Sequence, residues 1–221
     1  MKSLKNYIQE KLIINSLQEK LVIKKSTAKT SKIVEYKYFP ETKKELKSII
    51  KKRIREEGSE VDLNDIDVSK ITDMSSLFEE TSFNGDISNW DVSNVTNMSS
   101  MFYNCSKFNQ DISTWDVSNV INMDEMFNSC IKFNKDISAW DVSNVKTMYS
   151  MFYRCIDFNQ DISAWDVSNV TNMRFMFKGC KSFNQDVSKW DVSKVTFMSG
   201  VFSNCPIEEK HKPKFKSTYD L

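Results

Sequence analysis

Five cysteines recur at intervals of 25 residues, and thiols at a fixed spacing are candidates for metal binding or disulfide formation. If each unit forms one coil of a stack, neighbouring cysteines would lie about 5 Å apart, within disulfide range. Each cysteine, however, follows Met and Phe at helical spacing, where a free thiol packs as a small apolar group. The count is odd and no CxxC pair occurs, so we expect buried free thiols, with no metal site and no cofactor. They are Cys105, Cys130, Cys155, Cys180 and Cys205.

Two series of aspartates follow the same interval and could bind calcium between coils. Like charges about 5 Å apart repel by roughly 1 kcal/mol in water and about 3 kcal/mol at an intermediate dielectric, so something must offset the repulsion. Calcium would do so, but calcium loops usually contain glycine, and this chain has only 4. Backbone N–H groups in the D-I-S and D-V-S turns are the favoured alternative. The series are Asp86, Asp111, Asp136, Asp161 and Asp186, and Asp91, Asp116, Asp141, Asp166 and Asp191.

Catalytic patterns are missing from the sequence. Glycine-rich phosphate-binding motifs do not occur, and the single histidine, His211, lies in the polar C-terminal part. A serine, cysteine or histidine-rich catalytic site would have to use that one imidazole. We therefore predict no catalytic residues and a protein that is not an enzyme.

The residues above belong to a repeated unit that must position them. Apolar positions recur with the same 25-residue period, which is the signature of stacked repeat architectures. An imperfect first copy has Ile66 in place of tryptophan and Thr81 in place of cysteine. The tryptophans form a structural series at Trp90, Trp115, Trp140, Trp165 and Trp190.

Each copy contains two patterns. Residues such as Met98, Met101, Phe102 and Cys105 have the spacing of one face of a helix. The residues from 87 to 95 read as short extended pieces and tight turns. Neither piece can bury its apolar side chains alone, so neighbouring copies must share one core.

The run VTNMSSMFYNCSKF matches the VT-x-I-…-AF-x-x-C-x-x-L pattern of BspA-like leucine-rich-repeat surface proteins. The unit FNxDISxWDVSNVTNMxxMFxxC resembles the bacterial surface-protein repeat of that superfamily over residues 61–205, and YFPETKKELKSIIKKRI resembles its entry segment. The resemblance implies an α/β repeat fold. This is a right-handed leucine-rich-repeat-like solenoid of about six coils, each with short parallel strands and a short helix. It also implies adhesion or binding rather than catalysis.

The ends of the repeat array define four parts. We expect an amphipathic or flexible leader at 1–30, a strand and capping helix at 31–60, the repeats at 61–205 and a polar tail at 206–221. Thr42 and Glu45 form a capping-box pattern, and Gly58 should end the helix.

Charge and hydropathy bear on partners and location. Residues 1–60 carry 16 Lys/Arg against 8 Asp/Glu, whereas the repeats are acidic. No aromatic or Gly-Arg interleaving indicates nucleic-acid binding, and no apolar run is long enough for a membrane span. Charges interrupt the start of the chain where a signal peptide needs its apolar stretch, so we expect a cell-associated or virion location rather than ordinary secretion.

Within the repeats, partner recognition should use positions that vary from copy to copy. The later copies introduce aromatic and arginine side chains there, the common composition of binding hot spots. Alternatively, some of these side chains cover the C-terminal end of the stack. We expect a cation–π contact between Tyr149 and Arg174, one coil apart. The candidate partner-binding residues are Tyr149, Tyr153, Arg154, Arg174, Phe175 and Phe197.

The sequence therefore predicts a non-enzymatic binding or adhesion protein that presents an extended surface to a protein or glycan. The alternative is a structural component of a larger particle, such as a phage virion, docked through residues 1–20. The start MKSLKNYIQEKL, followed by KLVIKK, resembles leaders on some tailed-phage proteins.

Overall fold

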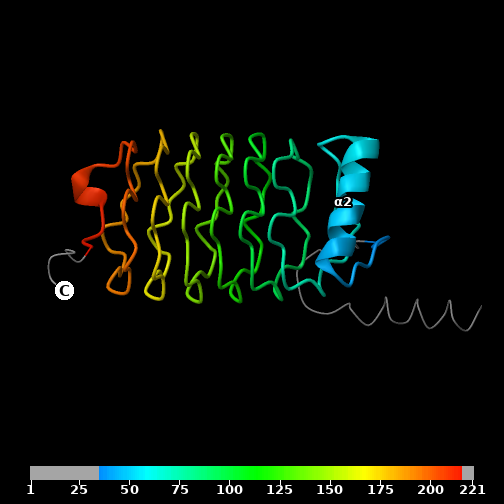
Figure 1. The fold of residues 1–221 in the computed structure, drawn as a ribbon, viewed down its shortest axis with the longest axis horizontal. Helices are drawn as coiled ribbons and strands as arrows, with labels where there is room; N and C mark the ends of the chain where they lie inside the picture. The colour runs from blue at the N-terminus through cyan, green and yellow to red at the C-terminus, as the bar shows by residue number, and fades with distance from the viewer. Residues whose placement is uncertain (1–34, 216–221) are drawn as a thin grey trace, which may run out of the picture. The chain divides into compact units, whose positions relative to one another are not determined.

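The computed structural model describes residues 35–215, and the expected leader, including the docking segment at residues 1–20, lies outside them. Two helices are present in the described part, the α-helix α2 at Lys43–Glu57 and a short 3-10 helix at Glu209–His211. Between them the chain forms coils that lie side by side (Figure 1). Neither helix is long and apolar enough to cross a membrane.

The helix α2 begins and ends as its sequence indicates. The Thr42 hydroxyl accepts the Glu45 N–H, and the Glu45 carboxylate accepts the Thr42 N–H, which completes the capping box. The Gly58 N–H donates to the Ile54 carbonyl at 3.0 Å, with a φ of 94° that favours glycine. Leu46 and Ile50 on one face are buried, so α2 covers the apolar interior of the first coil.

The predicted α/β solenoid, with strands and a helix in every coil, is wrong. Within residues 35–215, the coils contain no helix and no strand, only turns and isolated parallel bridges such as Asn97↔Asn122 and Asn122↔Thr147. The strand expected before α2 is likewise reduced to one bridge, Tyr38↔Ile66. A single bridged residue does not make a strand, because a strand needs several consecutive residues paired with its neighbour.

The expected helix fails for a local reason. In Met98–Cys105, Ser100 and Asn104 have φ angles of 54° and 55°, in the left-handed region. A left-handed residue at every fourth position turns the neighbouring peptide groups away from the helix axis. The i→i−4 hydrogen bonds of an α-helix therefore cannot form. Short i→i−3 bonds replace it, such as Met101 N–H to the Met98 carbonyl at 3.2 Å.

The rotated peptide groups bond to the next coil instead. Met98 N–H donates to the Asn122 carbonyl at 2.9 Å, and Phe102 N–H donates to the Met126 carbonyl at 2.9 Å. Four such bonds, from every second residue, occur at each junction. We call these stretches the ladder segments: residues 73–80, 97–104, 122–129, 147–154, 172–179 and 197–204.

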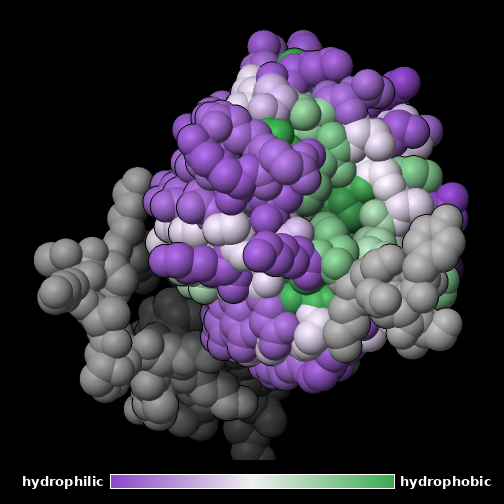
Figure 2. Space-filling view, turned by 90° about the vertical axis from the view of Figure 1, so that its left-hand side faces the viewer, coloured by the Kyte–Doolittle hydropathy of each residue, from purple (hydrophilic) through white to green (hydrophobic). Residues whose placement is uncertain are grey.

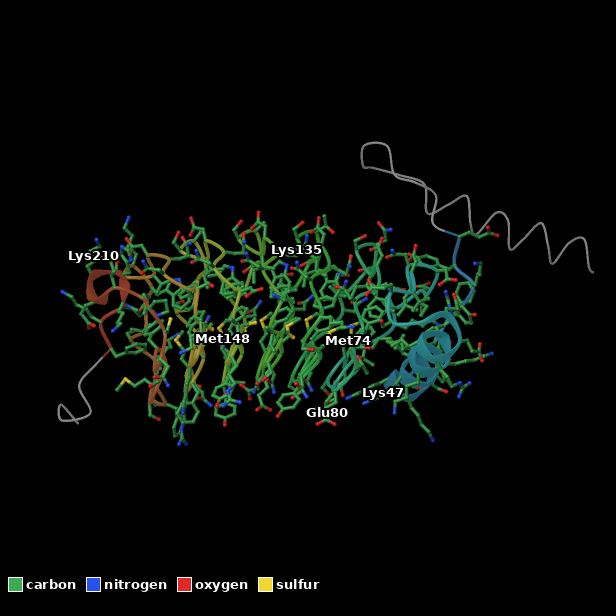
Figure 3. All side chains as sticks on the ribbon, turned by 90° about the horizontal axis from the view of Figure 1, so that it is seen from above. Lys47, Met74, Glu80, Lys135, Met148 and Lys210 are labelled. Carbon is green, nitrogen blue, oxygen red and sulfur yellow. The ribbon has the colours of Figure 1, made fainter. Side chains whose placement is uncertain are left out.

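The interior is a set of identical columns. The Phe102 and Phe127 rings are stacked with centroids 5.6 Å apart, and Phe127 and Phe152 continue the column at 5.7 Å. Figure 3 shows Met74 and Met148 inside the stack, with Glu80 and Lys135 projecting from its two edges. Every coil therefore buries the same apolar side chains against the equivalent residues of its neighbours.

The C-terminal end is covered only in part. Residues 206–215 cross one side of the last coil, where Val187 N–H donates to the His211 carbonyl at 3.0 Å. Ile207 and Pro213 are buried there. Met198, Phe202 and Cys205, however, are only partly buried, unlike their equivalents in earlier coils. This segment thus caps the last coil less completely than α2 caps the first.

Candidate binding surface

The cysteine column lies inside the stack as free thiols. Each sulfur bonds to a backbone carbonyl near its coil junction, for example Cys130 Sγ to the Phe102 carbonyl at 2.9 Å and Cys180 Sγ to the Phe152 carbonyl at 2.8 Å. Burial raises the pKa of the Cys105 thiol to about 11, and it raises the pKa of Cys155 well above the usual value. Because the thiolate is the nucleophile and metal ligand, these groups are held in their unreactive form.

The tryptophan column is also interior. The indole rings are 3 to 5% exposed, and each Nε1–H donates to a main-chain carbonyl of the preceding coil. Trp140 Nε1–H donates to the Ile112 carbonyl at 3.1 Å, and Trp165 repeats the bond to Ile137 at 3.1 Å. A buried indole thereby satisfies its single donor, and the column links every coil to the one before it.

The aspartate series cap turns. Asp136 Oδ1 accepts the Ser138 N–H at 2.9 Å, and the same bond recurs in both series, as from Ser143 N–H to Asp141 at 3.0 Å. Hydrogen bonds from Ser138 lower the pKa of Asp136, although repulsion from Asp161 opposes them. The turn bonds therefore outweigh the repulsion between neighbouring carboxylates. Among residues 35–215, no three His, Cys, Asp or Glu side chains group as metal ligands would.

Asparagine side chains join the coils along two further columns. Asn119 Nδ2 donates to the Ser93 carbonyl at 2.8 Å, and Asn144 Nδ2 donates to the Ser118 carbonyl at 2.8 Å. Asn134 N–H donates to Asn109 Oδ1 at 3.0 Å in the other column. These amides are occupied by the fold, which leaves the positions that vary between coils as the candidates for a binding surface.

The varying positions of the ladder segments 147–154 and 172–179 form a connected group of rings and cations. The Tyr149 and Phe175 ring centroids lie 6.3 Å apart. The Arg174 guanidinium lies 4.6 Å from the Phe175 centroid, and Lys178 Nζ lies 4.8 Å from the same ring. Lys178 Nζ is also 5.9 Å from the Tyr153 centroid, which ties the two segments together.

Arg154 completes the group, with its guanidinium 5.3 Å from the Tyr153 centroid. We call the set Tyr149, Tyr153, Arg154, Arg174, Phe175 and Lys178 the aromatic–cation patch. The three aromatic side chains and Lys178 are half-buried, and the two arginines are exposed, so the patch faces outward. Its composition is that of a binding surface with desolvated rings and free positive charge.

One sequence-based expectation about the patch needs correction. The contact expected between Tyr149 and Arg174 is absent among residues 35–215, because Arg174 lies over the ring of its own neighbour, Phe175. Phe197 is 61% exposed and makes no ring or cation–π contact in the described part of the chain, so its expected part in partner binding stays a prediction. Conversely, Lys178 was missed by the sequence reasoning, although it lies four residues after Arg174, at a position where other copies have Glu, Tyr, Asn or Ser.

Backbone geometry at the patch is unusual. Phe175 and Arg154 have φ angles of 61° and 54°, at positions where other coils place Ser, Asn, Glu or Gly. A bulky residue with positive φ costs about 1–2 kcal/mol relative to glycine. The Phe175 ring lies over Gly200, where any added Cβ would come within 2.7 Å of it. Part of the alternative expectation therefore holds: Phe175 does lean onto the last coil, which leaves its outer ring face to the patch.

Comparisons with known proteins place the repeats in a family. A family model described as "Mycoplasma protein of unknown function, DUF285" matches twice, over residues 44–152 and 110–215, and together the matches cover most of the chain. The match supports a repeat family, a coarser statement than the BspA-like leucine-rich-repeat resemblance. No curated protein and no solved structure matches this sequence.

Proposed function

The chain belongs to the DUF285 repeat family, and from this premise we propose that it is a non-enzymatic binding protein. Its aromatic–cation patch docks an acidic surface of a partner protein. The single observation that carries the proposal is the patch itself: three rings and three cations in mutual contact, all at positions that differ between coils whose remaining residues repeat.

The state of the recurring polar groups supports a binding role over catalysis. A nucleophilic cysteine needs a lowered pKa, whereas burial raises the pKa of Cys130 and Cys155. A general acid needs a raised carboxyl pKa, whereas turn hydrogen bonds lower the pKa of Asp111 and Asp161. The cysteines pack in the interior and the aspartates cap turns. The outer positions that vary between coils are therefore the ones available for binding.

The chemistry of the patch supports an acidic protein partner. Arg154, Arg174 and Lys178 supply three positive charges, and each lies over a ring and forms no ion pair within residues 35–215. Rings hold the cations in place at a low cost in conformational entropy, and carboxylates of a partner can then bind them from outside. Tyr and Phe faces between the cations would contact apolar side chains of the same partner.

The strain at Phe175 supports selection for binding rather than stability. The equivalent positions are Ser76, Ser100, Glu125, Ser150 and Gly200, all with positive φ and none aromatic. A phenylalanine at this position lowers stability locally, and strained residues of this kind cluster where a surface serves recognition.

The experiment compares three forms of the full chain. The test variant is Tyr149→Ala with Phe175→Ala, and the matched control is Ser99→Ala with Glu125→Ala, the same two positions of the repeat two coils earlier. Each immobilised form is incubated with extract of the source cells, and bound proteins are quantified by mass spectrometry. A partner should bind the parent and the control equally and the test variant at least tenfold less.

Three further results decide the matter. Arg174→Glu with Lys178→Glu should also lose the partner, since it reverses charge without removing a ring. Circular dichroism must show that each variant melts within a few degrees of the parent. Equal capture of proteins by the parent and all variants would overturn the proposed protein partner. So would a test variant that captures proteins as the parent does but loses binding to a glycan array.

A further inference from the structure

The last ladder segment ends the stack with a row of unused hydrogen-bond donors. In every earlier segment, the N–H groups of alternate residues donate to carbonyls of the next coil; Met173 donates to Phe197 at 2.8 Å and Phe177 to Val201 at 2.8 Å. Within residues 35–215 no further coil follows residues 197–204. The corresponding N–H groups have no acceptor among residues 35–215. They belong to Met198, Gly200, Phe202 and Asn204.

This edge offers more donors than acceptors. The carbonyls of residues 197, 199, 201 and 203 already accept bonds from the preceding coil. The Gly200 and Phe202 carbonyls accept the Ser203 and Cys205 N–H groups within the coil, and the Asn204 carbonyl accepts Lys181 Nζ at 3.5 Å, so that of the row only the Met198 carbonyl has no donor among residues 35–215. An ordinary β-strand edge would present both kinds of group, so a simple added strand would leave its own N–H groups unpaired here.

Aligned peptide groups make the same edge electropositive. At each junction four peptide groups point their N–H toward the C-terminal end and their carbonyl toward the N-terminal end. Dipoles aligned in this way add, as they do in a helix, and place partial positive charge at the donor end. Negative groups are therefore favoured at residues 197–204.

The opposite end of the stack illustrates this rule. There two lysines of α2 lie against the first coil. Lys47 Nζ donates to the Ser76 carbonyl at 2.6 Å, and Lys43 Nζ donates to the Asp73 carboxylate at 3.2 Å. Cations thus lie at the N-terminal end of the stack, as aligned dipoles favour, and the complementary group for the donor end is a chain that carries carboxylates.

An apolar pocket lies beside the donor row. It has a volume of ≈ 690 Å³, and its walls include Phe202, Phe215 and Pro213. Figure 2 looks onto this end and shows hydrophobic surface exposed between hydrophilic borders. Part of the core is open here, because Phe202 is only partly buried whereas its equivalents are fully buried.

Lysines surround the pocket. Lys210, Lys212 and Lys214 line it, with Glu209 as the one acidic residue in the lining. Figure 3 shows Lys210 at the end of the stack. Two of these lysines pair with exposed carboxylates, Lys210 with Glu208 at 2.8 Å and Lys212 with Glu209, and exposed pairs of this kind are readily exchanged for another carboxylate.

We propose that the C-terminal end of the stack is a docking site for an acidic peptide segment of a partner protein. Backbone carbonyls and carboxylates of the segment accept the N–H groups of Met198, Gly200, Phe202 and Asn204, and an apolar side chain enters the pocket at Phe202. A second copy of this chain does not fit, because two donor edges repel and the acceptor edge is covered by α2. The site is separate from the aromatic–cation patch and adds a second contact.

The probe is a fluorescein-labelled octapeptide with glutamate at every second position and phenylalanine or glycine between. Its binding to the full chain is followed by fluorescence anisotropy, and amide hydrogen exchange of residues 197–205 is measured with and without it. The peptide should bind saturably and slow exchange in this stretch at least tenfold. The same peptide with lysine for glutamate should not bind.

Variants locate the site. Lys210→Glu with Lys212→Glu and Lys214→Glu should weaken binding about tenfold, because the rim becomes repulsive. A matched triple change at exposed lysines elsewhere, Lys51→Glu with Lys107→Glu and Lys146→Glu, should leave the affinity unchanged. Tyr149→Ala with Tyr153→Ala should bind the octapeptide as the parent does, so this test can fail or succeed independently of the proposed function.

Three outcomes would overturn the proposal. Equal binding of the lysine peptide would show that charge plays no part. Slow exchange of the Met198, Gly200, Phe202 and Asn204 amides in the free full chain would show that the chain covers its own edge. Binding without any change of exchange in residues 197–205 would place the peptide elsewhere.

Discussion

Residues 97–104 and residues 172–179 follow the same backbone path but present different surfaces. Each segment donates four hydrogen bonds to the next coil and buries the same Met, Met and Phe positions. On the outside, however, Ser99 and Ser100 of the first are replaced by Arg174 and Phe175 of the second. The backbone therefore does not depend on these outer side chains, and the aromatic–cation patch needs another explanation than folding.

The shared interior can be broken with one substitution. Trp140→Ala removes a ring that is 3% exposed and the hydrogen bond from its Nε1 to the Ile112 carbonyl. We expect a loss of about 3–5 kcal/mol, the range for large core truncations, measured by urea denaturation. A variant that melts within a degree or two of the parent, or a parent whose tryptophan emission is that of exposed indole, would contradict an interior shared by all coils.

Thiols in the inner coils should react more slowly than the thiol in the last coil, where the core is partly open. Cys155 is fully buried with a strongly raised pKa, whereas Cys205 is partly buried in the last coil and its pKa is raised less. We expect Cys205 to react with Ellman's reagent at pH 8 at least tenfold faster than the others, since exposure governs access. Cys205→Ser identifies the fast phase, and equal rates for all five thiols would mean that the stack opens as readily in its middle as at its end.

Acid should weaken both segments alike through the aspartate turns. Hydrogen bonds lower the folded-state pKa of Asp116, Asp136 and Asp166, so their contribution is present above the ordinary carboxyl pKa of about 4 and lost as pH falls below it. We expect Tm to fall steadily between pH 5 and pH 2. Asp136→Asn keeps a side-chain acceptor for Ser138 N–H but cannot titrate, so it should reduce the slope slightly; an unchanged Tm down to pH 2 would contradict the turn assignment.

The outer face should tolerate a change that the interior does not. Phe175→Asn relieves left-handed strain of about 1–2 kcal/mol but loses ring contact with Gly200, and these effects oppose each other. We expect stability within about 1 kcal/mol of the parent. Phe177→Ala, two residues away and fully buried, serves as the contrast at about 3–5 kcal/mol. Similar losses for both would remove the distinction between interior and patch.

The smallest expected effect concerns metal. Because Ser N–H groups already bond the aspartates, EDTA should leave Tm unchanged in thermal unfolding followed by circular dichroism. A drop of several degrees that added calcium reverses would show that the carboxylate columns need a cation as well.

The sequence predicted the columns and the cap but not the path of the backbone. Period and residue type suffice to place Trp140 inside, to pair Asp136 with a turn and to cap α2 at Thr42, because each depends on local chemistry. The helix over Met98–Cys105 was wrong, because i, i+3, i+4 and i+7 spacing also fits a chain of tight turns. The polar residues at 100 and 104 were the available signal for left-handed geometry.

The contacts of the patch lay beyond sequence reasoning for a related reason. Which ring Arg174 covers depends on the direction of the Phe175 side chain, and that direction is set by the sign of one φ angle. Variation between copies identified which positions carry aromatic and cationic side chains. It could not show which ring each cation covers.

The identical bonding at every junction has a mechanical consequence. If the stack is pulled from its ends, each coil that detaches breaks a similar set of bonds before the next coil carries the load: the four ladder bonds, a backbone bond such as Lys146 N–H to the Ile121 carbonyl, and the tryptophan, asparagine and cysteine side-chain bonds. Each event then releases 25 residues, about 85 Å of contour length. Under tension the chain would lengthen in equal steps, and refolding of each coil onto the remaining stack would reverse them. The repeats would thus act as an extensible tether of constant step size.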